Sequence, residues 1–251
     1  MTIGRTLAVQ TFEEWGKRDY SRPHRDARRG MLPPKLARMM VNMLGMLPRG
    51  TLLDPFCGSG TVLAEAALLG WPKIIGADKS PRAVKDAKSN MGWLRMHYLT
   101  KKLFSNSREL ENRNNVKIFT CPIENLPSRL APSSVEAIVT EPYLGTPLVS
   151  PPSLAAVNRL RGELLPLYNN MLQVFAKVLT INGRAIFVAP HWCLADGREI
   201  GLAVADLPWP KKLRLLSPLQ TLPQYKNTAL IYRRPHQFVA REIILLEKVS
   251  P

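Results

Sequence analysis

One stretch of the chain, residues 52–61, reads LLDPFCGSGT. It opens as a short apolar run, passes through Asp54 and a turn of small residues, and leads into helically spaced apolar residues at 62–69. That order predicts a strand, a loop and a helix. Gly58 and Gly60 remove side chains where a ligand could approach the backbone. Asp54 would end the strand at the edge where open α/β sheets hold their ligands.

A second strand pattern, residues 73–77, ends in Asp78. An acid after the second strand is the usual partner of the two hydroxyls of a ribose, so we expect a nucleoside in the ligand. A dinucleotide is disfavoured because the loop lacks GxGxxG and a pyrophosphate would lie beside the anionic Asp54. S-adenosylmethionine (SAM), with its cationic sulfonium and free amino group, suits both acids. A sheet turn that holds no ligand is the alternative.

The composition favours an α/β domain with a nucleic-acid partner. The chain has 251 residues, of which 45% are hydrophobic and 22% charged, enough for a sizeable core. Lys and Arg number 35 against 19 Asp and Glu, which gives a formal net charge of +16. Such an excess favours a polyanion, although a merely solvated basic surface is the alternative. No apolar run could span a bilayer and no segment is both strongly basic and strongly amphipathic, so we expect no membrane partner.

Cysteine use and the first residues favour a cytoplasmic protein. Cys57, Cys121 and Cys193 lie far apart and lack metal-ligand spacing, so we expect no metal site. An odd number of cysteines without a disulfide framework suits a reducing compartment. Residues 1–14 lack the apolar core of a signal peptide.

Charge and patterning divide the chain into a basic arm, residues 1–29, and one domain, residues 30–251. The arm is expected to be irregular, and it either stays flexible or folds partly over the ligand site. An insertion at 93–113 is predicted to be helical. Its alternating basic and aromatic residues would either grip single-stranded nucleic acid or form a solvated helix.

The remaining pattern predicts a mainly parallel, doubly wound α/β sheet. Helices are expected after Pro33-Pro34, from Ser80-Pro81 to about Met91, and over a long apolar repeat that begins near Leu164 and closes near Asn182-Gly183. Further strands are predicted at 116–120, 135–140 and 184–189, followed by a loop at 191–193. Two last strand patterns, 229–233 and 238–246, are typical of an antiparallel hairpin.

Several of these motifs resemble one enzyme family. DPFCGSGT at 54–61, GADKS at 76–80 and EPYLG at 141–145 are similar to motifs of SAM-dependent methyltransferases that include the THUMP-associated tRNA guanosine-N2-methyltransferases. Residues 18–42 resemble that family's lead-in segment, which lies beside the cofactor, and residues 233–248 resemble its closing hairpin. The resemblance implies a Rossmann-like class I methyltransferase fold with SAM as cofactor.

The same resemblance implies tRNA as the partner. Residues 1–29, which precede the expected domain, are too few for a THUMP-like domain. The RNA would therefore be gripped by the basic surface of the catalytic domain or with the help of a protein partner.

The resemblance also implies which residues hold SAM. The first motif would bind the methionine end and the sugar through Asp54, Pro55, Phe56, Cys57, Gly58, Gly60 and Thr61. Asp78 would bind the ribose hydroxyls and Lys79 would flank the adenine. The family's acid after the third strand is replaced by CPIE at 121–124. Adenine would therefore be read by the backbone of Ile123 or by Glu124.

Residues 141–145 carry the catalytic prediction. Amine methyltransferases that the chain resembles have Asp/Asn/Ser-Pro-Pro-Tyr/Phe at this place. The first side chain and a proline carbonyl of that motif accept hydrogen bonds from the base amine. The aromatic ring stacks on the extruded base. In this chain the corresponding catalytic residues are Glu141, Pro142 and Tyr143, and the second proline is absent. Glu141 can accept from an amine with one more methylene of reach, and Tyr143 can stack if the loop shifts.

The predicted activity is methylation of an exocyclic base amine in RNA, with guanine N2 in tRNA as the target. Two alternatives remain. A DNA amine methyltransferase is compatible with the motif at 141–145. A non-catalytic, basic RNA-binding or partner subunit with a decayed site would suit the altered motif.

Overall fold

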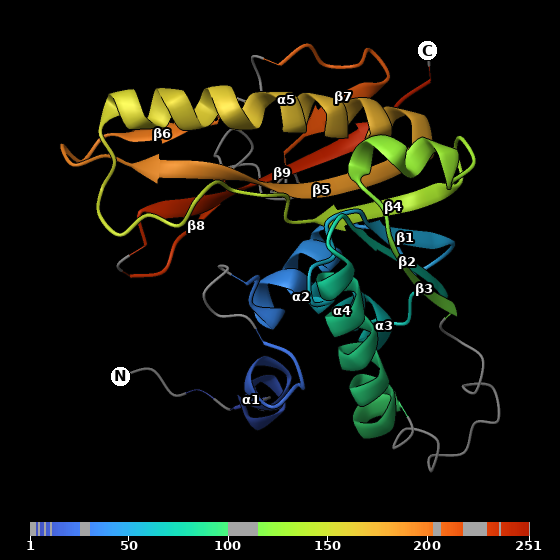
Figure 1. Ribbon diagram of the computed structural model, residues 1–251. Coiled ribbons are helices and arrows are strands. Elements are labelled where there is room, and N and C mark those ends of the chain that lie inside the picture. Colours follow the sequence, from blue (N-terminus) through green and yellow to red (C-terminus); the bar gives the residue numbers. More distant parts are fainter. Residues whose placement is uncertain are drawn as a thin grey trace.

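A mixed β-sheet covered by helices on both faces makes up the computed structural model (Figure 1). The structure describes all of the chain except residues 1–3, 5, 8, 11, 26–30, 100–114, 203–206, 218–229, 236 and 251. Within the described part, no helix is long and apolar enough to cross a membrane.

The sheet combines a parallel half with an antiparallel half. The parallel strands are β1 (Thr51–Asp54), β2 (Lys73–Asp78), β3 (Asn115–Thr120), β4 (Val135–Thr140) and β5 (Leu179–Cys193). The strands that pair antiparallel are β6 (Glu199–Gly201), β7 (Leu213–Leu216), β8 (Leu230–Tyr232) and β9 (Val239–Lys248). The order across the sheet is β3-β2-β1-β4-β5-β9-β7, with β6 beside β5 and β8 beside β9. The predicted closing hairpin is confirmed as β8 and β9.

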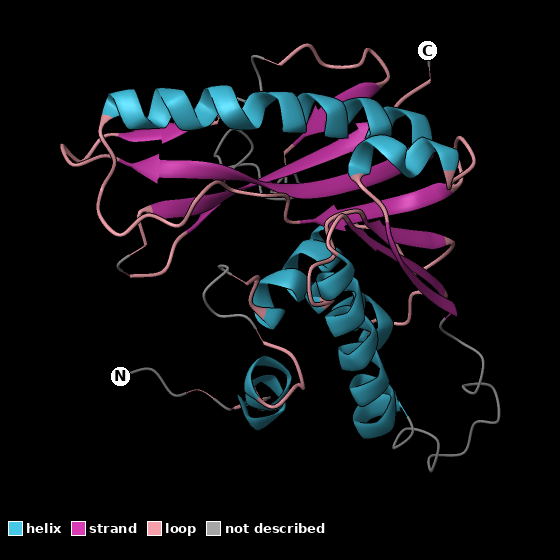
Figure 2. Ribbon diagram, in the orientation of Figure 1, coloured by secondary structure: helices cyan, strands magenta, loops and turns pink. Residues whose placement is uncertain are grey.

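Helices connect the parallel strands and bury the two faces of the sheet (Figure 2). One face carries α2 (Pro34–Met43), α3 (Thr61–Leu68) and α4 (Pro81–Leu94), which continues into the π-helix η2 (Arg95–Leu99). The other face carries α5 (Leu154–Val178) and the short 3-10 helix η4 (Ile123–Ser128). The apolar side of α5 packs Tyr168 and Phe175 against Phe187 of β5. The predicted doubly wound arrangement is therefore confirmed.

The strand order predicts a ligand site between β1 and β4. From β1 the chain moves outward through β2 to β3, and it then returns to place β4 and β5 on the other side of β1. In open α/β sheets, ligands bind outside the carboxyl ends of the strands where the order reverses. Asp54 ends β1 and Glu141 directly follows β4, so both flank this point.

The N-terminal arm is more ordered than the sequence suggested. A helix, α1 (Phe12–Tyr20), lies against α2, so the expectation of an irregular arm is wrong over these residues. Arg18 is buried, donates to Glu65 of α3 at 2.8 Å and stacks over Trp15. Polar contacts join α1 to its neighbours: Arg18 pairs with Glu65, and the cations of Lys35 and Arg38 lie over the Trp15 ring. Its sequence has no helical repeat of apolar residues that would have predicted it.

Strand β5 is longer than predicted at both ends. It begins at Leu179, directly after α5, and Asn182 adopts a φ of 62° inside it, where the pairing with β4 shifts register. Asn182-Gly183 therefore marks a bulge and does not end the helix. The predicted loop at 191–193 is also wrong, because these residues pair with β6 and β9.

Two smaller predictions can be compared only in part. The helix expected to end near Met91 continues to Leu94, and the insertion begins with the π-helix η2. The insertion's residues 100–114 lie outside the described part of the chain.

Candidate functional site

The glycine loop joins β1 to α3 in a backbone conformation that favours glycine. Gly58 has a φ of 50°, and Gly60, the N-cap of α3, has a φ of 87°. A Cβ at Gly60 would lie 3.3 Å from the Cβ of Ala87, so the site is tight as well as left-handed. Because Gly60 has no capping side chain, the first N–H groups of α3 face the loop without a side-chain acceptor from the cap.

Asp54 lies at the carboxyl end of β1 and is 2% exposed. Its Oδ1 accepts hydrogen bonds from the hydroxyl of Thr140 at 2.6 Å and from the backbone N–H of Phe56 at 3.1 Å. Burial raises the pKa of Asp54 to about 7, and these two hydrogen bonds act in the opposite direction. Among the described residues, both donors to this side chain bind Oδ1. Oδ2 is therefore left for a donor from a ligand.

Asp78 lies at the neighbouring strand end and organises the loop. Its Oδ2 accepts from the backbone N–H of Gly58 at 2.9 Å, and its Oδ1 accepts from that of Ser80 at 2.8 Å. Each carboxylate oxygen keeps a lone pair that could accept from a further donor. A pair of hydroxyls on adjacent carbons offers two such donors.

The other residues predicted to surround the adenine of the cofactor follow Asp78 or the neighbouring strand β3. The backbone N–H of Cys121 donates to the carbonyl of Asp78 at 2.9 Å, which holds the end of β3 beside it. Ile123 is buried, so its side chain belongs to the core, whereas Lys79 and Glu124 are exposed. The choice between the Ile123 backbone and Glu124 as the reader of a base therefore stays a prediction.

Glu141 forms a buried ion pair that the sequence did not reveal. Arg241 of β9 donates through Nε to Oε2 at 2.5 Å and through Nη2 to Oε1 at 3.2 Å. Burial raises the pKa of Glu141, and the Arg241 charge and hydrogen bond oppose that shift. Arg241 is 4% exposed. The carboxylate is thus fixed in orientation and retains lone pairs that could accept from an amine.

The two residues after Glu141 have different surroundings. Pro142 is buried, and Tyr143 is 56% exposed with its hydroxyl 3.3 Å from that of Thr146. The hydroxyl of Tyr168 on α5 has one proton and lies 3.1 Å from the carbonyl of Val188 and 3.4 Å from that of Tyr143. The exposed ring of Tyr143 is available for stacking.

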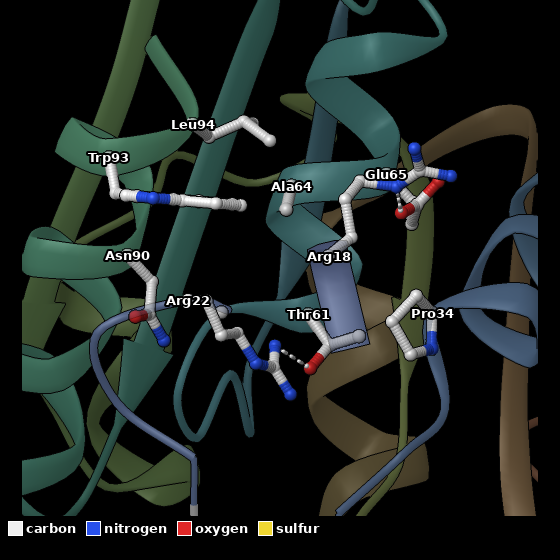
Figure 3. A pocket seen from close by; sticks show the side chains of 10 residues that line it. Arg18, Arg22, Pro34, Thr61, Ala64, Glu65, Asn90, Trp93 and Leu94 are labelled. Carbon is white, nitrogen blue, oxygen red and sulfur yellow. Dashed lines mark hydrogen bonds and ion pairs between the residues drawn. The ribbon is translucent and has the colours of Figure 1, made fainter. Parts of the chain in front are cut away.

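The lead-in segment lies against the glycine loop (Figure 3). Arg22 donates to the hydroxyl of Thr61 at 2.8 Å. The side-chain amide of Asn90 donates to the carbonyls of His24 and Ser59, both at 2.9 Å, and accepts from the His24 N–H. One side chain therefore ties the lead-in to the loop.

Sequence reasoning thus found Asp54, Asp78 and Glu141 but missed Thr140 and Arg241, which hydrogen-bond two of these acids. It also missed the contacts of Arg22 and Asn90 with the glycine loop. The signal for Arg241 was a single arginine inside the apolar strand pattern FVAREIILL. In the described part of the chain, no cluster of three or more His, Cys, Asp or Glu could hold a metal ion.

Comparison with known families decides the class of the domain. The family model described as RMKL-like, methyltransferase domain matches residues 22–196. The chain belongs to this family. S-adenosylmethionine is the cofactor of this methyltransferase domain. The residues present fit this molecule. Asp54 could accept from its amino group and Asp78 from its ribose hydroxyls, and the glycine loop would let it come close to the backbone.

Relatives of this methyltransferase domain include two archaeal enzymes named tRNA (guanine(10)-N2)-dimethyltransferase. That of Pyrococcus abyssi is 33% identical over 234 residues, which cover 92% of this chain and 52% of the relative. That of Methanocaldococcus jannaschii is 30% identical over 202 residues, covering 78% and 50%. The chain therefore spans about half the length of these relatives.

Solved structures confirm the Rossmann-like class I methyltransferase fold. TrmN from Thermus thermophilus matches with a TM-score of 0.57 and 20% identity over 97% of this chain and 55% of its own. A precorrin-6y C5,15-methyltransferase from Geobacter metallireducens matches with a TM-score of 0.52 and 11% identity, over 92% and 95%. Since proteins of such different names share the fold, the fold alone does not select a substrate.

Proposed function

We propose that this chain transfers a methyl group from SAM to the exocyclic amine N2 of guanine in tRNA. The observation that carries the proposal is the placement of Asp54, Asp78 and Glu141 around the carboxyl ends of β1, β2 and β4. The names of the relatives, tRNA (guanine(10)-N2)-dimethyltransferases, support this target.

The cofactor would lie across the glycine loop. Asp54 accepts from its amino group, Asp78 accepts from both ribose hydroxyls, and Lys79 flanks the adenine. The loop residues with which these acids bind the methionine and sugar are Pro55, Phe56, Cys57, Gly58, Gly60 and Thr61. Ile123 or Glu124 reads the adenine.

The target amine would meet Glu141 at the end of β4. The carboxylate and the carbonyl of Pro142 accept its two N–H groups, which directs the nitrogen lone pair at the sulfonium methyl, and Tyr143 stacks on the extruded base. The nitrogen forms the new N–C bond as the C–S bond breaks, and S-adenosylhomocysteine leaves. The proton lost from nitrogen passes to water. Orientation supplies the rate, so a strong base is unnecessary.

Nucleoside mass spectrometry tests this function. The protein is incubated with labelled SAM and unmodified host tRNA, and the digested product is expected to contain labelled N2-methylguanosine. Label in an adenine or cytosine amine, or transfer to DNA alone, would reassign the substrate. SAM binding without transfer to RNA or DNA would favour the non-catalytic alternative.

The pKa of Asp54 predicts a pH dependence of cofactor binding. The ligand's ammonium needs the anionic carboxylate, and burial raises the pKa of Asp54 to about 7. Affinity for SAM should therefore fall as the pH drops below that value, by up to about tenfold per pH unit. Calorimetric titration in buffers of different ionisation enthalpy should also show proton release on binding in this acidic range. Asp54→Asn should flatten the profile, and an affinity that rises towards acid would contradict the assignment.

A row of cations on α4 is our candidate for the RNA grip. Arg82, Lys85 and Lys88 are exposed at successive intervals of three residues, and no described carboxylate forms an ion pair with them. The helix that carries them begins just beyond Asp78, so the row leads away from the cofactor crevice. Such a row suits the phosphates of an RNA strand.

The Arg82→Gln/Lys85→Gln/Lys88→Gln variant should bind tRNA more weakly and with a weaker salt dependence. Each lost phosphate contact reduces the slope of log affinity against log salt by about 0.7–0.9, whereas SAM affinity should not change. Lys73→Gln/Lys177→Gln, which removes two exposed cations at the start of β2 and near the end of α5, is the control. Filter binding at several salt concentrations measures the slopes. Equal slopes for wild type and the α4 variant would exclude this surface.

Three further predictions complete this picture. The boundary near residue 29 between a basic arm and a catalytic domain of residues 30–251 stays as proposed, although α1 contacts α2. We place the protein in the cytoplasm, which cell fractionation tests. A protein partner that adds RNA grip would appear as a second subunit when the tagged protein is purified from its host.

A further inference from the structure

Arg22 is the buried cation whose role the site described above does not explain. Its side chain belongs to the lead-in segment and is 7% exposed. Nη1 donates to the hydroxyl of Thr61 at 2.8 Å, and Nη2 faces the sulfur of Met31. Nε is buried without a hydrogen-bond partner in the structure. Among the described residues, this guanidinium with five donors thus has one hydroxyl and one thioether as acceptors, and a thioether is a weak acceptor.

No described carboxylate lies within ion-pair distance of Arg22, although arginines this deeply buried are usually paired. Glu65, a buried acid whose charge acts on Arg22, is already paired with Arg18 at 2.8 Å and with Arg38 at 3.2 Å. Burial lowers the pKa of Arg22, and Asp19 and Glu65 only partly oppose that effect. The guanidinium therefore has unused capacity for an anion.

The position of Arg22 restricts where that anion could lie. Its contact with Thr61 places the guanidinium at the first residue of α3, beside Gly60, which supplies no capping side chain (Figure 3). The helix N-terminus adds partial positive charge and free N–H groups. Asn90 fixes the backbone of His24, two residues from Arg22, to the loop carbonyl of Ser59. The cation is thus held at the glycine loop.

We propose that Arg22 and the N-terminus of α3 form a subsite for the carboxylate of the methionine part of SAM. The inference rests on the proposed function. The methionine end of the cofactor is a zwitterion, and the crevice has an anion for its ammonium in Asp54 and a buried cation for its carboxylate in Arg22. An RNA phosphate is the less suitable anion, because Arg22 is only 7% exposed and a polymer backbone could not reach it as a small ligand can.

Decarboxylated SAM, which keeps the sulfonium, the amine and the nucleoside, tests the subsite. Calorimetric titration should show that wild-type protein binds SAM about 10- to 100-fold more tightly than the decarboxylated compound, the strength of a charge-assisted hydrogen bond. Arg22→Gln should lose this factor for SAM and bind the decarboxylated compound as wild type does. Arg22→Lys should recover part of the discrimination.

The control is Arg25→Gln, an exposed arginine of the same segment, which should bind both compounds as wild type does. Equal losses for SAM and decarboxylated SAM in Arg22→Gln would show a purely structural role and overturn the proposal. The proposal would also be overturned if the wild-type protein bound SAM and decarboxylated SAM equally tightly, and this result does not depend on whether the variant folds. Failure of the wild type to bind either compound would instead contradict the proposed cofactor site, and the subsite with it.

Discussion

Exchange of Glu141 for glutamine is expected to slow methyl transfer by about 100-fold or more, the usual cost of removing one oriented polar group from a reacting centre. The Glu141 carboxylate lies just after β4, and both of its oxygens accept hydrogen bonds from Arg241. The amide would turn an NH₂ group towards Arg241 or towards the target amine, and either arrangement loses an acceptor. Single-turnover assays with saturating SAM measure the effect. SAM affinity should remain near the wild-type value.

The matched control for this variant is Glu247→Gln. Glu247 likewise pairs with arginine side chains, those of Arg184 and Arg214, but it lies near the opposite end of β9 from Arg241. It should lose stability without losing the chemical step. Breaking a buried ion pair such as Glu141–Arg241 costs about 3–5 kcal/mol. Urea unfolding must therefore show that each variant is folded under assay conditions. A parallel loss of SAM binding in Glu141→Gln would move Glu141 into the cofactor site.

Removal of the Asp78 carboxylate should weaken SAM binding by about 100-fold or more. A hydrogen bond to a charged group contributes about 1.5–3 kcal/mol, two ribose hydroxyls are involved, and 1.4 kcal/mol corresponds to a factor of ten. Asp78→Ala also leaves the backbone N–H groups of Gly58 and Ser80 without the hydrogen bonds that they donate to this carboxylate. Titration calorimetry with SAM measures the loss. Asp196→Ala, at an exposed acid paired with Arg198, is the control and should bind as wild type does.

A cofactor analogue separates the ribose contact from the ordering of the loop. The analogue is 3′-deoxyadenosyl-methionine, which lacks one ribose hydroxyl. The wild type should bind it more weakly than SAM. The Asp78→Ala variant should bind the two compounds equally. If the variant still discriminated between the two compounds by the wild-type factor, Asp78 would not contact that hydroxyl.

The sequence predicted the part of the site that depends on local chain chemistry. An apolar run, an acid and a glycine turn before a helix are consecutive residues, so 52–61 predicted β1, the loop and α3 without tertiary information. The Ser80-Pro81 start of α4 was readable for the same reason, and Ser80 accepts from the N–H of Ala83 as a cap does.

The missed features all depend on contacts between distant parts of the chain. Arg241 reaches Glu141 across 100 positions of sequence, and Arg18 reaches Glu65 across 47. The bulge at Asn182 is stabilised by pairing between β4 and β5. Nothing in local periodicity reports a partner that lies in another strand or helix, so α1 and the ends of β5 could not be placed from sequence.

A crystal structure of the protein with bound SAM tests the central claim most directly. The claim predicts the cofactor across the glycine loop, with its ribose hydroxyls within hydrogen-bond distance of Asp78, its amino group beside Asp54 and its sulfonium methyl directed at Glu141. Density for SAM at another place, or a cofactor whose ribose and amino group contact neither aspartate, would contradict it.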